Sequence, residues 1–498
     1  MPDPDTRAPT RRRPWSAVPA PLRALLVAVA AIALAWSLVT PAFMGPDEPA
    51  HFGYVQTLAE DAALPGTDDD AEGFSNEFRL GAGLSGMGNA AQQPGIRMEW
   101  NASVQEEWKR RSSRPPENRR DDGGGPGNSA ASNPPLYYLT AVPAYLVGEA
   151  TGIFTRVGLV RSVSIAWLLV AVVGAWLLAG ELLGRDRRAQ TATAGVVGLL
   201  PMSQFIAGTV SPDTAVFAAW AFTLWLGVRL LRHGPSVRGV LWLTLALGVA
   251  CVLKAASYAL VPAVGLLILL VLWRARRRDA DPIDGRAVVR LLGVAAAGLI
   301  GTLGAWLVVS RIAGVSAVGQ ASAVTGGEGG SLTGLLSYLW QFYLPMLPGM
   351  SPAPGQPALP VYDTMFTTGW GAFAWMEVRY PGWTYVLLLV GCLGVVAVAA
   401  RVAWERRSAI SWPVLGYFAL IVVGLLAGMH ITEFNMGGYG FIQGRYLLPL
   451  APLAGLILAV AIGRLPVATR TPALATVLGA LVVLNAWAMG LMTERFYA

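Results

Sequence analysis

The chain has 498 residues, of which 54% are hydrophobic and only 13% are charged, and its mean hydropathy is +0.51. This balance excludes a water-soluble domain of ordinary composition and is typical of a protein that crosses a bilayer many times. The net charge of +7 does not indicate nucleic-acid binding, because the arginines form short clusters between apolar runs. Both cysteines lie inside apolar runs, so neither a disulfide framework nor a cysteine metal site is expected.

The N-terminal tail, residues 1–23, is rich in arginine and precedes the first apolar run near 24–43. By the positive-inside rule this tail is cytoplasmic, and the residues after Met44 are extracytoplasmic. A cleaved signal peptide is the alternative, but the apolar run is long and no small-residue cleavage site follows it. We therefore expect residues 24–498 to form a single polytopic membrane domain. The tail arginines are Arg7, Arg11, Arg12, Arg13 and Arg23.

Further arginine clusters separate later apolar runs of about 17 to 24 residues, each long enough to cross about 30 Å of hydrocarbon. Alternating spans place every cluster in the cytoplasm and the C-terminus outside. The sequence thus predicts an all-α integral membrane protein with about eleven transmembrane helices. They are expected near 24–43, 159–184, 189–209, 213–231, 239–254, 257–273, 288–309, 383–400, 410–428, 446–463 and 473–492.

Two apolar stretches decide this count. The run 239–273 is too long for one crossing, and a single helix would put the arginines after it on the wrong side, so we expect a helical hairpin. The run 135–154 contains Pro143, and counting it as a crossing would invert all later clusters. It is predicted to be an outer-surface or re-entrant segment.

Two large extracytoplasmic loops follow from this topology, at 44–158 and 310–381. Within the first, residues 110–133 have the arginine, proline and glycine content of a disordered linker. The second combines a glycine-rich stretch, 326–330, with aromatic residues suited to an interfacial belt or lid. A third, short outer loop is expected at 429–445, where His430, Glu433 and Asn435 could touch substrate, although no spacing rule singles them out.

The sharpest local pattern lies where the first span emerges, in the sequence Gly45 to Phe52. Asp47, Glu48 and His51 stand together there, at the start of an expected amphipathic surface helix. A carboxylate at the mouth of the membrane is partly desolvated and can act as a general base near neutral pH. Plain helix capping is the alternative reading. Asp47, Glu48 and His51 are also candidate metal ligands.

Several cations lie on the same side of the membrane. Lys254 stands at the top of the expected hairpin, where it can reach a phosphate or snorkel to lipid headgroups. Arg161 and Arg445 lie at the outer starts of two expected spans. A phosphate or an acidic loop residue is expected to balance the positive charge of each. Asp213 begins a span at the same level, and helix capping explains it adequately by itself. Together these groups suggest one site in which a carboxylate base activates an acceptor hydroxyl and cations hold a phosphate.

These residues resemble the GT-C superfamily of polytopic glycosyltransferases, and within it a bacterial membrane-protein family whose first outer loop begins Pro-Asp-Glu-x-x-His-Phe, here Pro46 to Phe52. Asn133 to Tyr138 is similar to the family's Pro-Pro-Leu-Tyr-Tyr segment. Other landmarks, spread over almost the whole chain, follow in the family's order: Arg161, Ser211-Pro212-Asp213, Lys254 and Gln443-Gly444-Arg445-Tyr446.

The resemblance implies a GT-C-like transferase that uses a polyprenyl-phosphate-linked sugar donor and a glycan or lipid acceptor of the cell envelope. It implies Asp47 as the base, aided by Glu48, and substrate contacts from His51, Arg161, Asp213, Lys254, Gln443, Arg445 and Tyr446. Metal dependence varies across the superfamily, so Mg²⁺ or Mn²⁺ is a possible cofactor. The chain departs from the family in the long insert of its first loop and in Asn133, where related enzymes often have His.

A transporter or flippase of a lipid-linked component is the main alternative, and a scaffold subunit of an envelope assembly is a third. A transporter is expected to bind its substrate near the midplane between broken helices, often in paired repeats. No clear internal repeat is visible, and the polar candidates cluster at the outer side, which favours surface catalysis.

Overall fold

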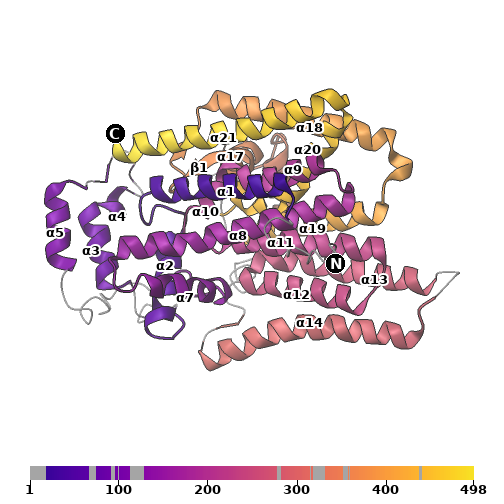
Figure 1. The fold of residues 1–498 in the computed structure, drawn as a ribbon, viewed down its shortest axis with the longest axis horizontal. Coiled ribbons are helices and arrows are strands. Elements are labelled where there is room, and N and C mark those ends of the chain that lie inside the picture. The colour runs from indigo at the N-terminus through magenta and orange to yellow at the C-terminus, as the bar shows by residue number, and fades with distance from the viewer. Residues whose placement is uncertain are drawn as a thin grey trace, which may run out of the picture.

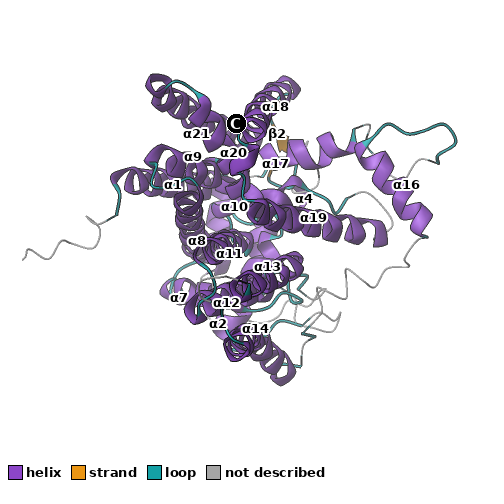
Figure 2. Cartoon of the chain, turned by 90° about the vertical axis from the view of Figure 1, so that its right-hand side faces the viewer, coloured by secondary structure: helices purple, strands orange, loops and turns teal. Residues whose placement is uncertain are grey.

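The computed structural model describes residues 18–66, 74–90, 93, 96–98, 100–112, 128–277, 282–314, 316–317, 331–351, 357, 359–436 and 440–498. Long helices run side by side along the long axis of the molecule (Figure 1) and are seen nearly end-on in Figure 2. Among the described residues, nine helices are long and apolar enough to cross a membrane. The all-α membrane architecture predicted from the sequence is therefore confirmed.

Each of these nine helices coincides with an expected span. The seven continuous helices are α1 (Ala20–Val39), α8 (Ile153–Leu182), α11 (Asp213–His233), α14 (Gly285–Ile312), α18 (Gly382–Glu405), α19 (Trp412–Asn435) and α21 (Val467–Tyr497). The other two begin with a 3₁₀ turn: η2 (Ala255–Ala259) leads into α13 (Leu260–Arg276), and η5 (Gly444–Leu450) leads into α20 (Ala451–Arg464). The two remaining expected spans are shorter or broken.

The expected span 189–209 is divided into α9 (Arg187–Leu199) and α10 (Pro201–Ala207). Pro201 has no backbone N–H, and Leu200 before it is extended with φ −56° and ψ 129°. Asn485 of α21 donates from Nδ2 to the freed carbonyl of Leu199 at 2.9 Å, and the Gln204 side chain donates to Gly198. Side chains within the bundle thus donate hydrogen bonds to backbone carbonyls that the helix break leaves without a helical partner.

The hairpin predicted for 239–273 is present. α12 (Val237–Leu253) ends at Lys254, which is extended with φ −162° and ψ 138°, and the chain then turns through η2 into α13. α12 has 17 residues, a length of about 25 Å, so it falls short of the other spans. α7 (Leu136–Val147) is shorter still at 12 residues, about 18 Å, and cannot cross the hydrocarbon layer alone.

Short helices of the segment between α1 and α8 gather at one end of the bundle, at the left of Figure 1, where α21 also ends. They are α2 (Glu48–Glu60), α3 (Asn76–Ser85), α4 (Met87–Ala90), α5 (Ala102–Ser112) and α7. The linker predicted at 110–133 needs correction at both ends. α5 continues to Ser112, and Asn128 is buried because its side chain donates to Ala50 O at 2.9 Å and accepts from Ala130 N at 2.8 Å. Residues 113–127 lie outside the described part.

The segment between α14 and α18 contains α16 (Leu332–Tyr343), the π-turn η3 (Val361–Phe366) and α17 (Thr367–Gly371). A short hairpin follows, in which two strands of two residues each, β1 (Ala372–Phe373) and β2 (Val378–Arg379), pair antiparallel. The glycine-rich stretch 326–330 lies outside the described residues. The short loop expected from 429 is wrong in its start, because α19 continues to Asn435 and keeps His430 and Glu433 helical.

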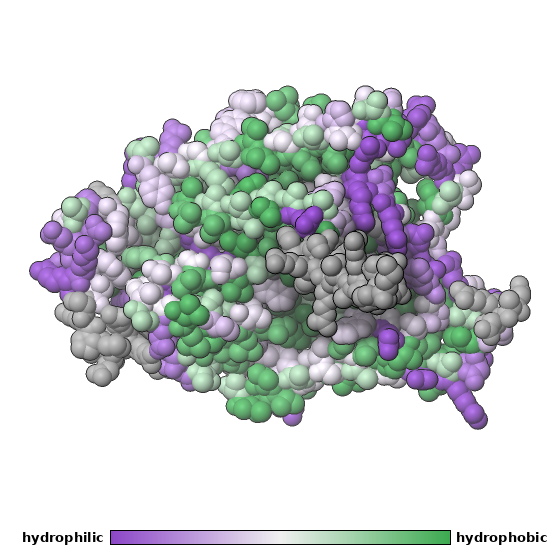
Figure 3. Space-filling view, in the orientation of Figure 1, coloured by the Kyte–Doolittle hydropathy of each residue, from purple (hydrophilic) through white to green (hydrophobic). Residues whose placement is uncertain are grey.

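α8 and α11 lie near the middle of the bundle and pack against each other and against α9 and α12. α14 and α18 lie at the periphery, and few of their residues are buried. In the space-filling view, hydrophobic side chains cover the middle of the molecule, while hydrophilic ones gather toward both ends (Figure 3). This distribution is what a bilayer around the middle of the bundle requires.

Candidate active site

Asp47 stands at the N-cap position of α2, directly after the chain leaves α1. Its backbone carbonyl accepts from His51 N at 3.1 Å, but its side chain makes no capping hydrogen bond. The cause is its left-handed backbone, with φ 55° and ψ 14°, whereas a capping residue normally adopts the β region. Asp47 is thus at the cap position without serving as the cap, and its side chain remains 53% exposed.

Arg445, at the start of η5, faces this carboxylate. Its Nη2 lies 3.1 Å from Asp47 Oδ2 and 3.3 Å from the hydroxyl of Tyr446, and its guanidinium lies over the Tyr446 ring. The guanidinium is almost completely buried, yet its Nε has no hydrogen-bond partner among the described residues. A buried guanidinium with a donor to spare is suited to an anionic ligand.

Lys254 and Asp213 form a second ion pair beside the first. Lys254 Nζ lies 2.6 Å from Asp213 Oδ1, and its ammonium also lies 5.2 Å from the centre of the Tyr446 ring. Tyr446 therefore contacts both cations. The two alternatives raised by the sequence, snorkelling for Lys254 and helix capping for Asp213, therefore do not apply. Lys254 points to Asp213 inside the bundle, and the Asp213 carboxylate binds this lysine and makes no capping hydrogen bond to α11.

His51 lies one turn into α2 and is buried near these charges. Asn133 Nδ2 donates to the Tyr138 hydroxyl at 2.8 Å, and this hydroxyl lies 2.9 Å from His51 Nδ1. Burial lowers the pKa of His51 to about 4, although the nearby carboxylates of Asp47 and Asp213 act in the opposite direction. His51 is therefore a neutral imidazole at pH 7.

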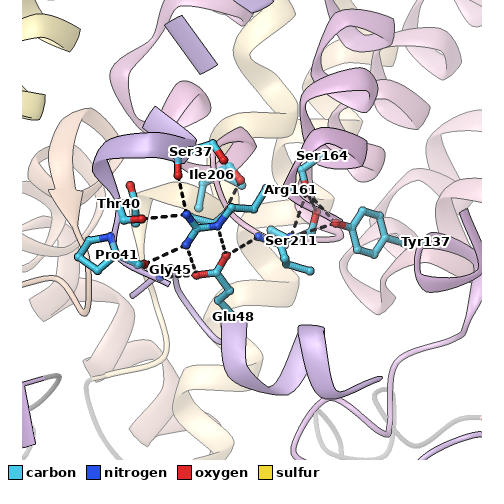
Figure 4. Close-up of polar contacts among 12 residues, drawn as sticks. Ser37, Thr40, Pro41, Gly45, Glu48, Tyr137, Arg161, Ser164, Ile206 and Ser211 are labelled. Carbon is cyan, nitrogen blue, oxygen red and sulfur yellow. Dashed lines mark hydrogen bonds and ion pairs between the residues drawn. The ribbon is translucent and has the colours of Figure 1, made fainter. Parts of the chain in front are cut away.

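Glu48 and Arg161 form a separate, fully enclosed pair (Figure 4). Arg161 Nε and Nη2 donate to the two Glu48 oxygens at 2.7 and 2.8 Å. Its three remaining N–H groups donate to the carbonyls of Ser37, Thr40 and Pro41 at 2.7 to 2.9 Å. All five donors of the guanidinium are therefore occupied.

Two expectations about site residues are corrected by this pair. Glu48 is 0% exposed and Arg161 is 3% exposed. Glu48 cannot reach a substrate proton, and Arg161 has no donor left for a phosphate. Both residues have a structural role at the base of the site. The remaining predicted residues, other than Gln443, gather around the two ion pairs.

Gln443 is the N-cap residue of η5, and its backbone carbonyl accepts from Tyr446 N at 3.1 Å. The next residue, Gly444, lies so close to η3 and α17 that an added Cβ would be 2.0 Å from Met365 O and 2.2 Å from Gly369 N. Its N–H donates to Thr368 Oγ1 at 2.6 Å. Contact with α17 thus fixes the backbone that carries Arg445.

Glu433 supports the same segment, a role that sequence reasoning missed. Its buried carboxylate accepts three backbone N–H groups, from Gly440, Phe441 and Ile442, at 2.7 to 2.8 Å. His430 is likewise structural, because its two ring nitrogens contact the hydroxyls of Tyr338 and Tyr343 on α16 at 3.0 and 2.7 Å. A carboxylate followed by a glycine-rich run was the available signal for the role of Glu433.

A metal site formed by Asp47, Glu48 and His51 does not fit this geometry. Glu48 is taken by Arg161, and His51 Nδ1 contacts Tyr138. In the described part of the chain, no group of three or more His, Cys, Asp or Glu side chains is placed to hold a metal ion. No step below is therefore derived through a metal.

The fold and this group of charges define a polytopic membrane protein with a charged site at the ends of several helices. The chain belongs to the family described as "Predicted membrane protein (DUF2142)", whose model matches residues 31–454. No curated protein matches the sequence.

Solved structures of similar fold include ArnT from Cupriavidus metallidurans bound to undecaprenyl phosphate, with 14% identity over 95% of this chain and 69% of that one and a TM-score of 0.49. The oligosaccharyltransferase of Archaeoglobus fulgidus in the apo form has 14% identity, coverage of 96% and 55%, and a TM-score of 0.44. The same archaeal enzyme, AglB, in complex with an inhibitory peptide and a dolichol-phosphate, has 12% identity, coverage of 96% and 56%, and a TM-score of 0.45. At TM-scores below 0.5, this likeness carries no argument about what this chain does.

Proposed function

We propose that this protein is a membrane glycosyltransferase that moves a sugar from a polyprenyl-phosphate-linked donor to a hydroxyl of a cell-envelope glycan or lipid. The observation that carries the proposal is the pair formed by Asp47 and Arg445. An exposed carboxylate lies 3.1 Å from a buried guanidinium, so a base and an anion-binding group share one small site.

In the proposed reaction, the Asp47 carboxylate takes the proton of the acceptor hydroxyl as the acceptor oxygen attacks the anomeric carbon. The bond between that carbon and the donor's phosphate oxygen breaks, and the polyprenyl phosphate leaves with the bonding electron pair. A proton thus passes to Asp47 and negative charge develops on the phosphate. Cations already held in place stabilise this charge without reorganising during the reaction.

Arg445 and Lys254 are those cations in the proposal. Arg445 has a buried Nε without a described partner, and the Lys254 side chain is 29% exposed, so the exposed part of Lys254 is available for an additional anionic contact. The Tyr446 ring contacts both side chains and spaces their charges. Asp47 and Asp213 balance the two cations while no phosphate is bound, which limits the cost of burying them.

The helix ends support a site at the membrane boundary. Asp47 follows α1, Lys254 ends α12, Asp213 starts α11 and Arg445 starts η5, and a lipid phosphate lies at this level of a bilayer. In the proposal, this boundary lies at the outer face of a bacterial plasma membrane, the side that the arginine clusters of the sequence favour. The N-terminus is then cytoplasmic and the C-terminus extracytoplasmic.

One feature, the break between α9 and α10, favours transport instead, because broken helices often form substrate sites in transporters. Asn485 and Gln204 already bond the freed carbonyls of Leu199 and Gly198, however. The break therefore offers those carbonyls to no ligand, whereas the site at the helix ends keeps an exposed carboxylate and an unused cationic donor.

The test uses purified full-length protein in nanodiscs with a panel of labelled polyprenyl-phosphate sugars and envelope glycan or lipid acceptors. We expect at least one donor to release polyprenyl phosphate and to transfer its labelled sugar to an acceptor. The amount of polyprenyl phosphate released should equal the amount of sugar transferred. A parallel assay in proteoliposomes follows movement of the intact donor between leaflets. Leaflet exchange without cleavage of any donor would overturn the proposal in favour of a flippase.

A further inference from the structure

We infer that the buried Glu48–Arg161 pair positions both carboxylates of the site, Asp47 and Asp213, relative to each other. Glu48 is the residue after Asp47, and its side chain reaches the segment that leads into Asp213. The catalytic part of this inference rests on the proposed function, whereas its structural part does not.

The Glu48 carboxylate joins two chain segments. Its Oε2 accepts from Gly45 N at 3.2 Å, two residues before Asp47, and its Oε1 accepts from Val210 N at 2.9 Å, three residues before Asp213. The two segments also touch directly, because a Cβ on Gly45 would lie 2.6 Å from Thr209 Cβ. A single carboxylate thus sets the spacing of the two segments.

Helix α8 holds this carboxylate in place. Arg161 binds both Glu48 oxygens and also the last carbonyls of α1 and the turn after it (Figure 4). One turn further along α8, Ser164 Oγ accepts from Ser211 N at 3.2 Å. The hydroxyl of Tyr137, on α7, accepts from the same N–H at 3.1 Å. Side chains one turn apart on one long helix therefore fix both segments.

This arrangement assigns Glu48 and Arg161 as positioning residues. If the pair is broken, the segments carrying Asp47 and Asp213 lose their common anchor while the two aspartates keep their own chemistry. Removing one partner leaves a buried charge uncompensated, whereas replacing both by apolar residues of similar size removes that penalty. Stability and positioning can therefore be separated by mutation.

The first measurement is amide hydrogen exchange on full-length protein in nanodiscs, which needs no activity. In Glu48→Gln and Arg161→Lys we expect peptides covering 43–47 and 209–213 to exchange at least tenfold faster together. Arg156→Lys is the matched control, because Arg156 is a buried arginine of the same helix that pairs with Glu77 of α3 and with Glu60 at the end of α2 instead. It should accelerate exchange in α3 and leave 209–213 unchanged. Unchanged exchange at 209–213 in both pair variants would overturn the inference.

The second measurement compares the double variant Glu48→Leu/Arg161→Met with the single variants. We expect its Tm to recover toward wild type, while kcat stays at least tenfold low. Glu48→Gln should retain the acid limb of the wild-type pH–rate profile, because Asp47 remains the base. A double variant that recovers both Tm and kcat, or loss of the acid limb in Glu48→Gln, would contradict the positioning role. If wild type transfers no sugar, the proposed function fails, and hydrogen exchange alone decides the inference.

Discussion

Lys254 Nζ donates a 2.6 Å hydrogen bond to Asp213 Oδ1, although the two residues end and begin different helices. The Asp213 side chain is 10% exposed and that of Lys254 is 29% exposed. Asp213 therefore keeps the ammonium charged and aimed beside Tyr446 and Arg445, instead of leaving it to bulk lipid headgroups.

We predict that Lys254→Met and Asp213→Asn each weaken polyprenyl-phosphate binding at least about tenfold, because either change removes or misdirects a desolvated cation. The double variant should be little worse than Lys254→Met, since Asp213 acts through that lysine. Lys109→Met is the matched control, because Lys109 is the other lysine of the chain and is exposed on α5. Losses that multiply in the double variant would assign Asp213 an independent role.

Gly444→Ala should destabilise the site, since its Cβ would collide with backbone atoms of η3 and α17. We expect a Tm decrease of several degrees in detergent and a loss of transfer, because Arg445 must move with the displaced backbone. Gly463→Ala, in α20, has nothing within 4 Å of the added methyl group and should not lower Tm. Equal Tm values for the two variants would show that the contact at Gly444 yields easily.

Glu433→Gln should loosen the segment that precedes Arg445. A glutamine has one acceptor oxygen, and its amide would face backbone N–H groups that the carboxylate now accepts. Hydrogen bonds to charged groups contribute about 1.5 to 3 kcal/mol each, so we expect a lower Tm and faster exchange at 440–446. Glu494→Gln, at an exposed position of α21, is the control. Wild-type exchange in the Glu433 variant would contradict the anchoring role.

Acid should destabilise the fold through His51. Its pKa is about 4 in the folded protein and about 6.5 when unfolded, so the unfolded chain binds the extra proton between these values. The free energy of unfolding therefore decreases as the pH falls from 6.5 toward 4, by up to about 3 kcal/mol. His51→Gln should reduce the Tm difference between pH 7.5 and pH 4.5. An identical acid response in the His51 variant would exclude this contribution.

Much of the fold could be predicted, because apolar length and arginine placement report directly on the bilayer. The hairpin at 239–273 and the short α7 follow from that physics. The break at Leu200 was not predicted, although Pro201 indicated it, because the apolar run continues through the proline. The end of α19 was also missed, since polar residues such as Glu433 extend a helix when backbone amides satisfy them.

The site was predicted in part, for a related reason. Charges that a membrane disfavours must find partners, which brought Asp47, Lys254 and Arg445 into one hypothesis. The sequence could not say which partner each charge takes. Arg161 looked like a phosphate ligand because its compensation by Glu48 and three carbonyls depends on how the chain turns after α1. Tertiary contacts set that turn, so no spacing of residues in the sequence predicts it.

The most direct test of the account is single-turnover sugar transfer by Asp47→Asn beside Asp61→Asn, an exposed aspartate just after α2. The account predicts a wild-type rate for Asp61→Asn. For Asp47→Asn it predicts donor binding within a few-fold of wild type and transfer at least about 100-fold slower. A wild-type transfer rate in Asp47→Asn would contradict the claim that this carboxylate is the base.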